Sequence, residues 1–332
     1  MAQSKKELVL AALNGKPVDR VPVGFWCHFT EVEERQDGLI NPAVVTKNIE
    51  GHKKYYEAFR PDFVKIMSDG YFGYPNERLR NLKSLAGFGS IEPLGENHPW
   101  IKKQVELVRT LKQAFGDEVL LFYNVFAPVK FFRLLQSENE HQVVADLIAE
   151  DKTVFQNILA VIAQDLAVLS EKVITEGGAD GIYFCVQSIQ NPAVNKEVYQ
   201  EVIAPADLAV LNAANAASAN NILHVCGFKG LRNDVTWFKD YPAKAVNWAV
   251  NVEGVSLAEG RKIFGGKAVI GGFDNTQDGY LYKGSREEVE AFTAGILKGS
   301  GKRGVILGAD CTVPNDIELE RLGWVREAAS RV

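Results

Sequence analysis

Short apolar runs alternate along the chain with longer stretches in which apolar residues recur every three or four positions. The short runs are rich in β-branched and aromatic residues, and they end close to Gly, Asp, Asn or Thr, which is typical of buried parallel strands. They predict eight strands, at residues 21–26, 63–67, 119–125, 181–187, 221–226, 245–250, 267–272 and 304–309.

The longer stretches predict helices at residues 151–176, 196–219, 256–264, 285–297 and 316–329. The first of these repeats apolar residues on one side, from Phe155 to Leu169. Ser285 and Glu288 form a capping box, which is expected to start the helix at residues 285–297. A short amphipathic helix is expected at the N-terminus, where the charged opening residues do not resemble a signal peptide.

Eight strands that alternate with helices over about 300 residues predict a single (β/α)₈ TIM barrel spanning residues 1–332. The polar segment 30–42 is expected to be an N-terminal excursion over the barrel mouth. Residues 130–149 are expected to form a helical insertion after the third strand. An open doubly wound sheet is the alternative, but no G-x-G-x-x-G follows an early strand, which argues against its dinucleotide-binding version.

Composition narrows the class of protein. The 332 residues are 46% hydrophobic and 24% charged, as in ordinary globular proteins. The net charge of -5, without a dense Lys/Arg stripe, argues against binding to nucleic acid. No apolar run is long enough to span a membrane. The four cysteines are widely spaced and predict reduced thiols in a cytoplasmic protein.

His224, Cys226 and Cys311 are the candidate metal ligands. His224 and Cys226 stand two apart on a predicted strand and therefore point to the same side. Cys311 follows the last predicted strand, and barrel enzymes carry their sites at the carboxyl ends of strands. An imidazole and two thiolates suit Zn²⁺ and leave one position open, as in catalytic zinc sites. A His-x-Cys alone is weak evidence, because free Cys is often buried.

Other polar residues lie at or near predicted strand ends. Asp69 is the candidate catalytic residue, and the candidate substrate-binding residues are Tyr123, Gln187, His28 and Asp274. Ordinary hydrogen bonding at a strand end, without a chemical role, is the alternative for these residues. Cys185 shares a strand face with Gln187 and could also approach the metal, but a small residue in a barrel strand is expected in the core.

Several segments together resemble the uroporphyrinogen decarboxylase superfamily, namely residues 19–23, 179–182, 223–227, 246–248 and 270–274. Within it the chain looks like the zinc-dependent corrinoid methyltransferase branch, typified by methylcobamide:coenzyme M methyltransferases. That branch carries a His-x-Cys and a distant Cys as zinc ligands, which match His224, Cys226 and Cys311. The resemblance also implies the barrel fold.

The chain departs from true decarboxylases in two places. Their Arg-rich segment after the first strand is replaced by residues 24–29, and no Arg occurs from residue 24 until Arg35. Their His near the eighth strand is replaced by Asp310 and Cys311, although Asp69 matches their catalytic Asp in position. We therefore expect no turnover of uroporphyrinogen, whose carboxylates would lack counter-charges.

The resemblance implies methyl transfer between a methylcobamide, carried on a separate corrinoid protein, and a small-molecule acceptor. Coenzyme M, tetrahydrofolate and another thiol all remain open as the acceptor, and a homodimer is compatible with the sequence. Three alternatives stay open: a decarboxylase of a smaller acid that uses Asp69, a zinc-dependent hydrolase, and a non-catalytic protein that binds a tetrapyrrole or a partner protein.

Overall fold

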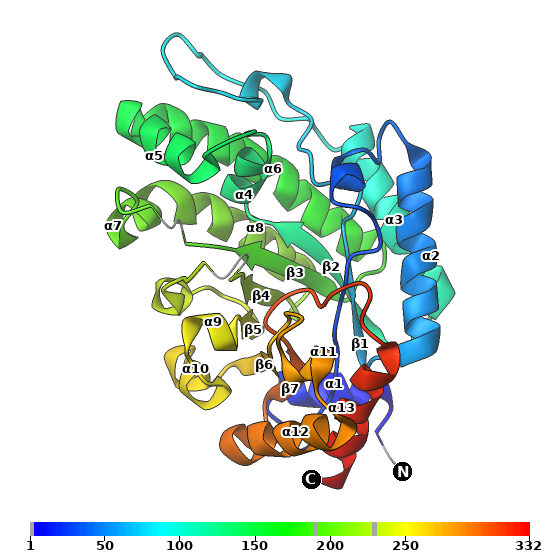
Figure 1. Cartoon of the computed structure of the whole chain (residues 1–332). Helices are drawn as coiled ribbons and strands as arrows, with labels where there is room; N and C mark the ends of the chain where they lie inside the picture. Colours follow the sequence, from blue (N-terminus) through cyan, green and yellow to red (C-terminus); the bar gives the residue numbers. More distant parts are fainter. Residues whose placement is uncertain (1–2, 189–190, 228–230) are drawn as a thin grey trace.

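A computed structural model describes residues 3–188, 191–227 and 231–332, and it contains one curved sheet of seven parallel strands (Figure 1). The strands are β1 (Phe63–Ile66), β2 (Leu120–Phe126), β3 (Gly181–Val186), β4 (Ile222–Val225), β5 (Ala245–Trp248), β6 (Ala268–Phe273) and β7 (Val305–Ala309). They lie side by side in chain order. This order is that of a TIM barrel and excludes the doubly wound sheet, in which the strand order reverses.

The first predicted strand, residues 21–26, is not a regular strand. Val23 makes an isolated parallel bridge to Leu307 of β7, and Gly24 N donates to Leu307 O over 2.9 Å. On the other side, Asp62 N donates to Val23 O over 2.9 Å, just before β1. Pro22 has no N–H, so a longer hydrogen-bonded ladder cannot form there. This segment nevertheless lies between β7 and β1 and closes the ring.

Helices surround the sheet on its outer side (Figure 1). The longer ones are α1 (Lys5–Leu13), α2 (Pro42–Phe59), α3 (Pro99–Phe115), α4 (Pro128–Leu134), α5 (Glu140–Glu150), α6 (Lys152–Thr175), α8 (Ala204–Ala217), α10 (Leu257–Ile263), α12 (Arg286–Ser300) and α13 (Leu319–Arg331). Single turns are η1 (Glu33–Gln36), η2 (Glu77–Leu79), α7 (Lys196–Val198), the π-helical η3 (Tyr199–Ile203), η5 (Val235–Phe238), α9 (Val250–Glu253) and α11 (Tyr280–Lys283).

The predicted helices form within a few residues of their expected bounds. The capping box predicted at Ser285 and Glu288 opens α12, and Asp151 caps α6. The predicted insertion at residues 130–149 is two helices, α4 and α5, because the chain turns at Asn139, which has a positive φ. None of the described helices combines the length and apolar character that a membrane span needs.

The segment 30–42 folds over the mouth of the barrel, as predicted. Arg35 O accepts hydrogen bonds from Gly70 N and Phe72 N, and Gly38 N donates to Gly70 O over 2.7 Å. A side chain at Gly38 would meet the Gly70 carbonyl oxygen at 2.7 Å, so only glycine permits this close approach. The segment is thus fixed to the loop that follows β1.

Two separate apolar cores follow from the alternation of side chains along the strands. The larger core lies between the sheet and the helices. The smaller fills the bottom of the barrel with alternate residues of the strands, and Val9, Ala12 and Leu13 of α1 belong to it. The chain therefore has an apolar plug at one end of the barrel, which leaves the carboxyl ends of the strands open for a site.

Candidate metal centre

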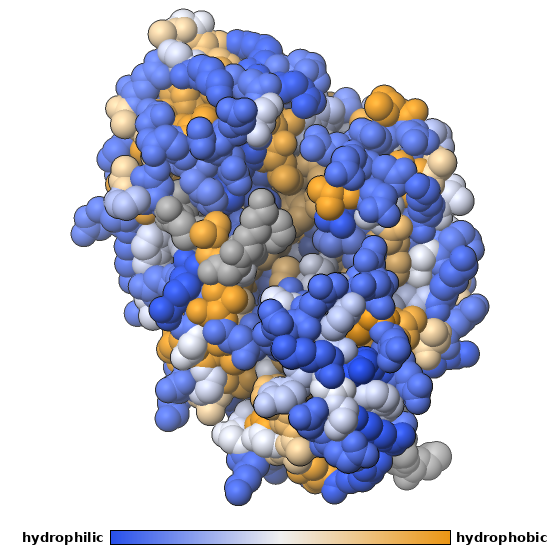
Figure 2. Space-filling model, viewed as in Figure 1, coloured by the Kyte–Doolittle hydropathy of each residue, from blue (hydrophilic) through white to orange (hydrophobic). Residues whose placement is uncertain are grey.

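The floor of the site is the layer of inward-facing residues directly above the apolar plug. Each residue of this layer stands two positions after a plug residue on the same strand, and so points the same way. The layer consists of Lys65, Asn124, Cys185, His224 and Asn247. The first four line a cavity of about 870 Å³, solvent at its mouth included. Figure 2 shows the hollow in this face of the molecule, with hydrophobic residues in its depth.

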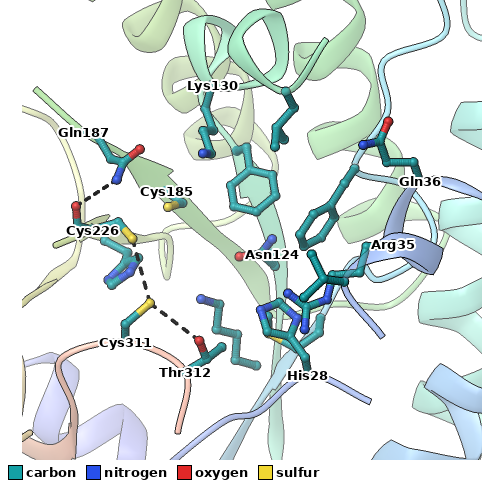
Figure 3. Close-up of a pocket in the computed structure, with 17 residues that line it drawn as sticks. His28, Arg35, Gln36, Asn124, Lys130, Cys185, Gln187, Cys226, Cys311 and Thr312 are labelled. Carbon is teal, nitrogen blue, oxygen red and sulfur yellow. Dashed lines mark hydrogen bonds between the residues drawn. The ribbon is translucent and has the colours of Figure 1, made fainter. Parts of the chain in front are cut away.

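Three of the four cysteines meet on one side of this cavity (Figure 3). Cys226 Sγ lies 3.8 Å from Cys311 Sγ, although β4 and β7 are separated by two strands. The ligand atoms of Cys185, His224 and Cys226 lie within 4.8 Å of one another. The structure therefore brings the three predicted ligands together, and it adds Cys185, which the sequence placed in the core.

His224 is buried among aromatic rings at the floor of the cavity. Its side chain is buried, and neither ring nitrogen has a hydrogen-bond partner. Trp26 and Tyr183 pack against the ring, with centroids 6.3 and 5.8 Å away. Burial lowers the pKa of His224, which favours the neutral imidazole that metals bind. Unpaired buried nitrogens are costly, and a metal ion would satisfy one of them.

The thiols are held in their neutral form when no metal is present. The neighbouring Cys185 thiol is the largest cause that raises the pKa of Cys226, to about 12. Cys226 in turn raises the pKa of Cys311 to about 12, with burial adding to the effect. A bound divalent cation reverses this situation, because a coordinated thiol loses its proton. Sulfur and imidazole ligands in this number suit Zn²⁺.

Three cationic side chains also line the cavity: Arg35, Lys65 and Lys130. Lys65 is buried, with its ammonium 4.9 Å from the Trp26 ring centroid and 4.3 Å from that of Tyr183. Burial lowers the pKa of Lys65, and the three nearby cysteines oppose this shift when they are thiolates. These cations favour anionic groups in the cavity. A lysine within the otherwise apolar run of residues 63–67 is the signal that could have identified Lys65 from the sequence.

His28 lies on the opposite side of the cavity from the cysteines (Figure 3), and this partly buried side chain pairs with the fully buried Asp69. His28 Nδ1 lies 2.7 Å from Asp69 Oδ1, and Phe29 N donates to Asp69 Oδ2 over 2.9 Å. Burial opposes ionisation of Asp69, but the hydrogen bond and charge of His28 hold its pKa below the usual value. Asp69 is fully buried and does not line the cavity, whereas His28 does.

The remaining candidates lie in different surroundings. Gln187 lines the cavity, but its Nε2 donates to Cys226 O and its Oε1 accepts from Arg133, so it braces the strand end. Tyr123 points outward and donates its hydroxyl to Gln104 of α3, because its neighbours Phe122 and Asn124 hold the inward positions. Asp274 accepts from Thr276 N within its own loop and lies outside the cavity lining.

Comparisons with known proteins agree with this architecture. A family model for uroporphyrinogen decarboxylase (URO-D) matches residues 74–332. A solved methyltransferase from Methanosarcina mazei superposes with a TM-score of 0.72 at 16% identity, covering 99% of this chain and 98% of that one. A putative vitamin-B12 independent methionine synthase from Listeria monocytogenes superposes with a TM-score of 0.58 at 12% identity. The match covers 94% of this chain and 98% of that one. These likenesses show the fold. No curated protein sequence matches significantly.

Proposed function

Because the chain belongs to the uroporphyrinogen decarboxylase family, we propose that it is a zinc-dependent methyltransferase that moves a methyl group between a corrinoid and a thiol or similar acceptor. The observation that carries the proposal is the group of His224, Cys226 and Cys311 at the carboxyl ends of the strands. The structural likeness to a protein described as a methyltransferase supports it. The departures from true decarboxylases, noted above, point the same way.

Zinc bound to these residues would supply a Lewis acid that lowers the pKa of an incoming thiol and makes it a nucleophile at neutral pH. His224 and the cysteines would hold the ion at the deep end of the cavity. Their positions are fixed by the sheet, because β4 pairs with both β3 and β5, and β7, which precedes Cys311, pairs with β6.

The rest of the cavity is suited to hold a small acceptor. Met67, Phe72 and Phe126 form an apolar wall, and the rings of Phe72 and Phe126 meet edge to face at 4.8 Å. This wall would exclude water from the reacting methyl group. Lys65 and Lys130 would attract an acceptor that carries a negative charge, as coenzyme M does, more strongly than a neutral thiol.

His28 is the residue that we assign to proton handling. Its Nδ1 is engaged by Asp69, which leaves Nε2 as the nitrogen available to a ligand in the cavity. Nε2 would accept the proton of the incoming thiol, and Asp69 would orient the ring and stabilise its charged form, as in other His–Asp pairs. Asp69 is then a positioning residue, since it acts through His28.

The methyl donor would arrive as a methylcobamide on a separate corrinoid protein. The four cysteines are all free thiols, which supports a reducing compartment such as the cytoplasm. The acceptor is a small molecule, and coenzyme M, tetrahydrofolate and other thiols are the classes to compare. Assembly as a homodimer is part of the same proposal.

A decarboxylase of a smaller acid is the second candidate, and the three cations of the cavity favour it, because they could bind a carboxylate. The two candidates differ in their need for metal. A decarboxylase that uses Asp69 would keep its activity in Cys226→Ala, whereas the methyltransferase would lose it.

The test is elemental analysis of the purified protein together with demethylation of methylcobalamin, with each acceptor class in turn. We expect about one zinc per chain in the wild type, bound at the site of His224, Cys226 and Cys311. Cys226→Ala and Cys311→Ala should lose zinc and methyl transfer together. In the wild type, a chelator should abolish methyl transfer, and added zinc should restore it. Full zinc in both variants, or methyl transfer that survives chelation, would contradict the proposal.

A further inference from the structure

Cys185 is the one cysteine of the cavity that is not explained by the predicted ligand set. It lies on β3 directly opposite His224 in the strand register, and its side chain is 4% exposed. It belongs to neither apolar core, whereas the remaining cysteine, Cys27, packs in the larger one. The surroundings of Cys185 therefore place it in the cavity with His224 and the other two cysteines, whereas Cys27 belongs to the larger apolar core.

The distances around Cys185 are those of a nearly assembled tetrahedral site. Four ligands at about 2.3 Å from a tetrahedral ion lie about 3.8 Å from one another. Cys226 Sγ and Cys311 Sγ are 3.8 Å apart, and the ligand atoms of Cys185, His224 and Cys226 are within 4.8 Å of one another. Cys226 takes part in both contacts, and Cys311 lies outside the group of three, so the Cys311 side chain must shift toward Cys185 and His224 to place all four around one point.

The charges of the cavity fit three thiolates better than two. A zinc ion with a neutral imidazole and three thiolates carries a net charge of -1, whereas with two thiolates it is neutral. Lys65 is buried beside the cysteines and is influenced by all three of them. A buried ammonium is costly unless an opposite charge compensates it, and a negative centre would do so.

We propose that Cys185 is the fourth ligand of the resting site, and that it leaves the metal when the acceptor thiol binds. The second half rests on the proposed function, whereas the first requires only that a metal binds. A site with four protein ligands is closed, so one ligand must leave before a substrate can bind. In the exchange the metal–sulfur bond of Cys185 breaks and one to the acceptor sulfur forms, so the number of coordinated sulfurs stays at three. The proton of the acceptor thiol passes to His28, as proposed above, and Cys185 leaves as a thiolate near the Lys65 ammonium.

The first experiment compares zinc affinity by competition with a chromophoric chelator. Cys185→Ala should weaken binding by about 100-fold or more, since loss of even an outer partner of a ligand costs roughly 10–100-fold. Cys27→Ala is the matched control and should bind zinc as the wild type does. Equal affinity in Cys185→Ala and the wild type, with zinc lost in Cys226→Ala, would overturn the assignment of Cys185 and leave the proposed function intact.

The second experiment needs no variant. X-ray absorption of the zinc-loaded wild type should give three sulfurs at about 2.3 Å and one nitrogen at about 2.0–2.1 Å. Two sulfurs with two lighter ligands would overturn the assignment, whether or not Cys185→Ala folds. If three sulfurs are found and no methyl transfer occurs with any acceptor, the function fails and the ligand assignment stands.

The exchange is tested with cobalt in place of zinc, because sulfur-to-cobalt absorption grows with the number of bound thiolates. The wild type and Cys185→Ala should absorb in a ratio of about three to two. Added coenzyme M should leave the wild-type intensity unchanged and raise that of Cys185→Ala by about half. A rise in the wild type, or no response in either protein, would overturn the exchange.

Discussion

The contact between His28 and Asp69 makes Asp69→Asn the most informative single change on the side of the cavity away from the cysteines. Asn has the shape of Asp, so the apolar surroundings are preserved. Its amide oxygen can still accept from Phe29 N, but its amide nitrogen cannot accept from His28 Nδ1. The substitution therefore removes one charge-assisted hydrogen bond and leaves the imidazole free to rotate or to change its protonated nitrogen.

The loss of stability can be approximated from this geometry. A hydrogen bond to a charged group contributes about 1.5–3 kcal/mol, and the 2.7 Å contact is fully buried on the Asp side. We take about 2 kcal/mol. A chain of 332 residues has an unfolding entropy of about 0.7 kcal/mol/K, so the melting temperature should fall by about 3 °C.

The pH dependence has a definite sign. The folded protein holds the pKa of Asp69 below its ordinary value of 3.8. A lowered pKa stabilises the fold above that value, and the contribution is lost as pH falls through the folded-state pKa. The stability difference between wild type and Asp69→Asn should therefore be constant near neutral pH and should shrink below about pH 4.

Urea denaturation and calorimetry over this pH range measure the loss of stability in Asp69→Asn. A methyl-transfer assay measures how the loss of this contact affects activity. Activity should fall by about 100-fold, as when a positioned acid–base group is lost, while zinc content should not change. Asp274→Asn is the matched control, since that carboxylate accepts only within its own loop and Asn can do the same. Wild-type stability and wild-type activity in Asp69→Asn would refute the reasoning.

Two further predictions concern the scaffold. Burial raises the pKa of Asp207 to about 7, against the hydrogen bonds from Tyr199 and Tyr241, so the fold should lose stability as pH rises from about 4 to 7. Burial also raises the pKa of Asp310 to about 7, so Asp207→Asn should reduce this slope in urea midpoints measured across that range without removing it, and an unchanged slope would contradict the prediction. A side chain at Gly24 would meet the Phe63 ring at 2.3 Å, so Gly24→Ala should destabilise the protein by about 1–3 kcal/mol. If Gly24→Ala unfolds at the same urea concentration as the wild type, the Phe63 ring moves aside without cost and the prediction is wrong.

The strands could be predicted because buried parallel strands are almost continuously apolar. The exception, residues 21–26, shows that composition does not reveal whether the backbone can pair when Pro22 interrupts it. Helix α2 was not predicted, because two of its buried positions are Asn48 and His52, which interrupt its apolar pattern. Helix α3 was also missed, although its buried residues are regularly spaced and could have predicted it.

The sequence could predict which candidate ligands share a face of one strand, but not which residues of neighbouring strands lie opposite each other. His224 and Cys226 share a face because they stand two residues apart. The approach of Cys185 depends on the stagger between β3 and β4, which pairs it with His224 and which no local pattern encodes. Tyr123 differs by one position from an inward residue, and a shift of one residue reverses the face.

The two walls of the cavity meet at the single bridge between Val23 and Leu307, which is the joint where the barrel closes. Cys311 follows β7 on one side of this joint, and Asp69 follows β1 on the other, with His28 attached to the closing segment itself. The cysteine-bearing strands β3 and β4 are joined by a regular ladder, whereas the joint rests on the few hydrogen bonds around residues 22–24. The barrel wall is thus like a collar with one seam: it is held by the fewest backbone hydrogen bonds at residues 22–24, whereas regular ladders join every pair of neighbouring strands from β1 to β7.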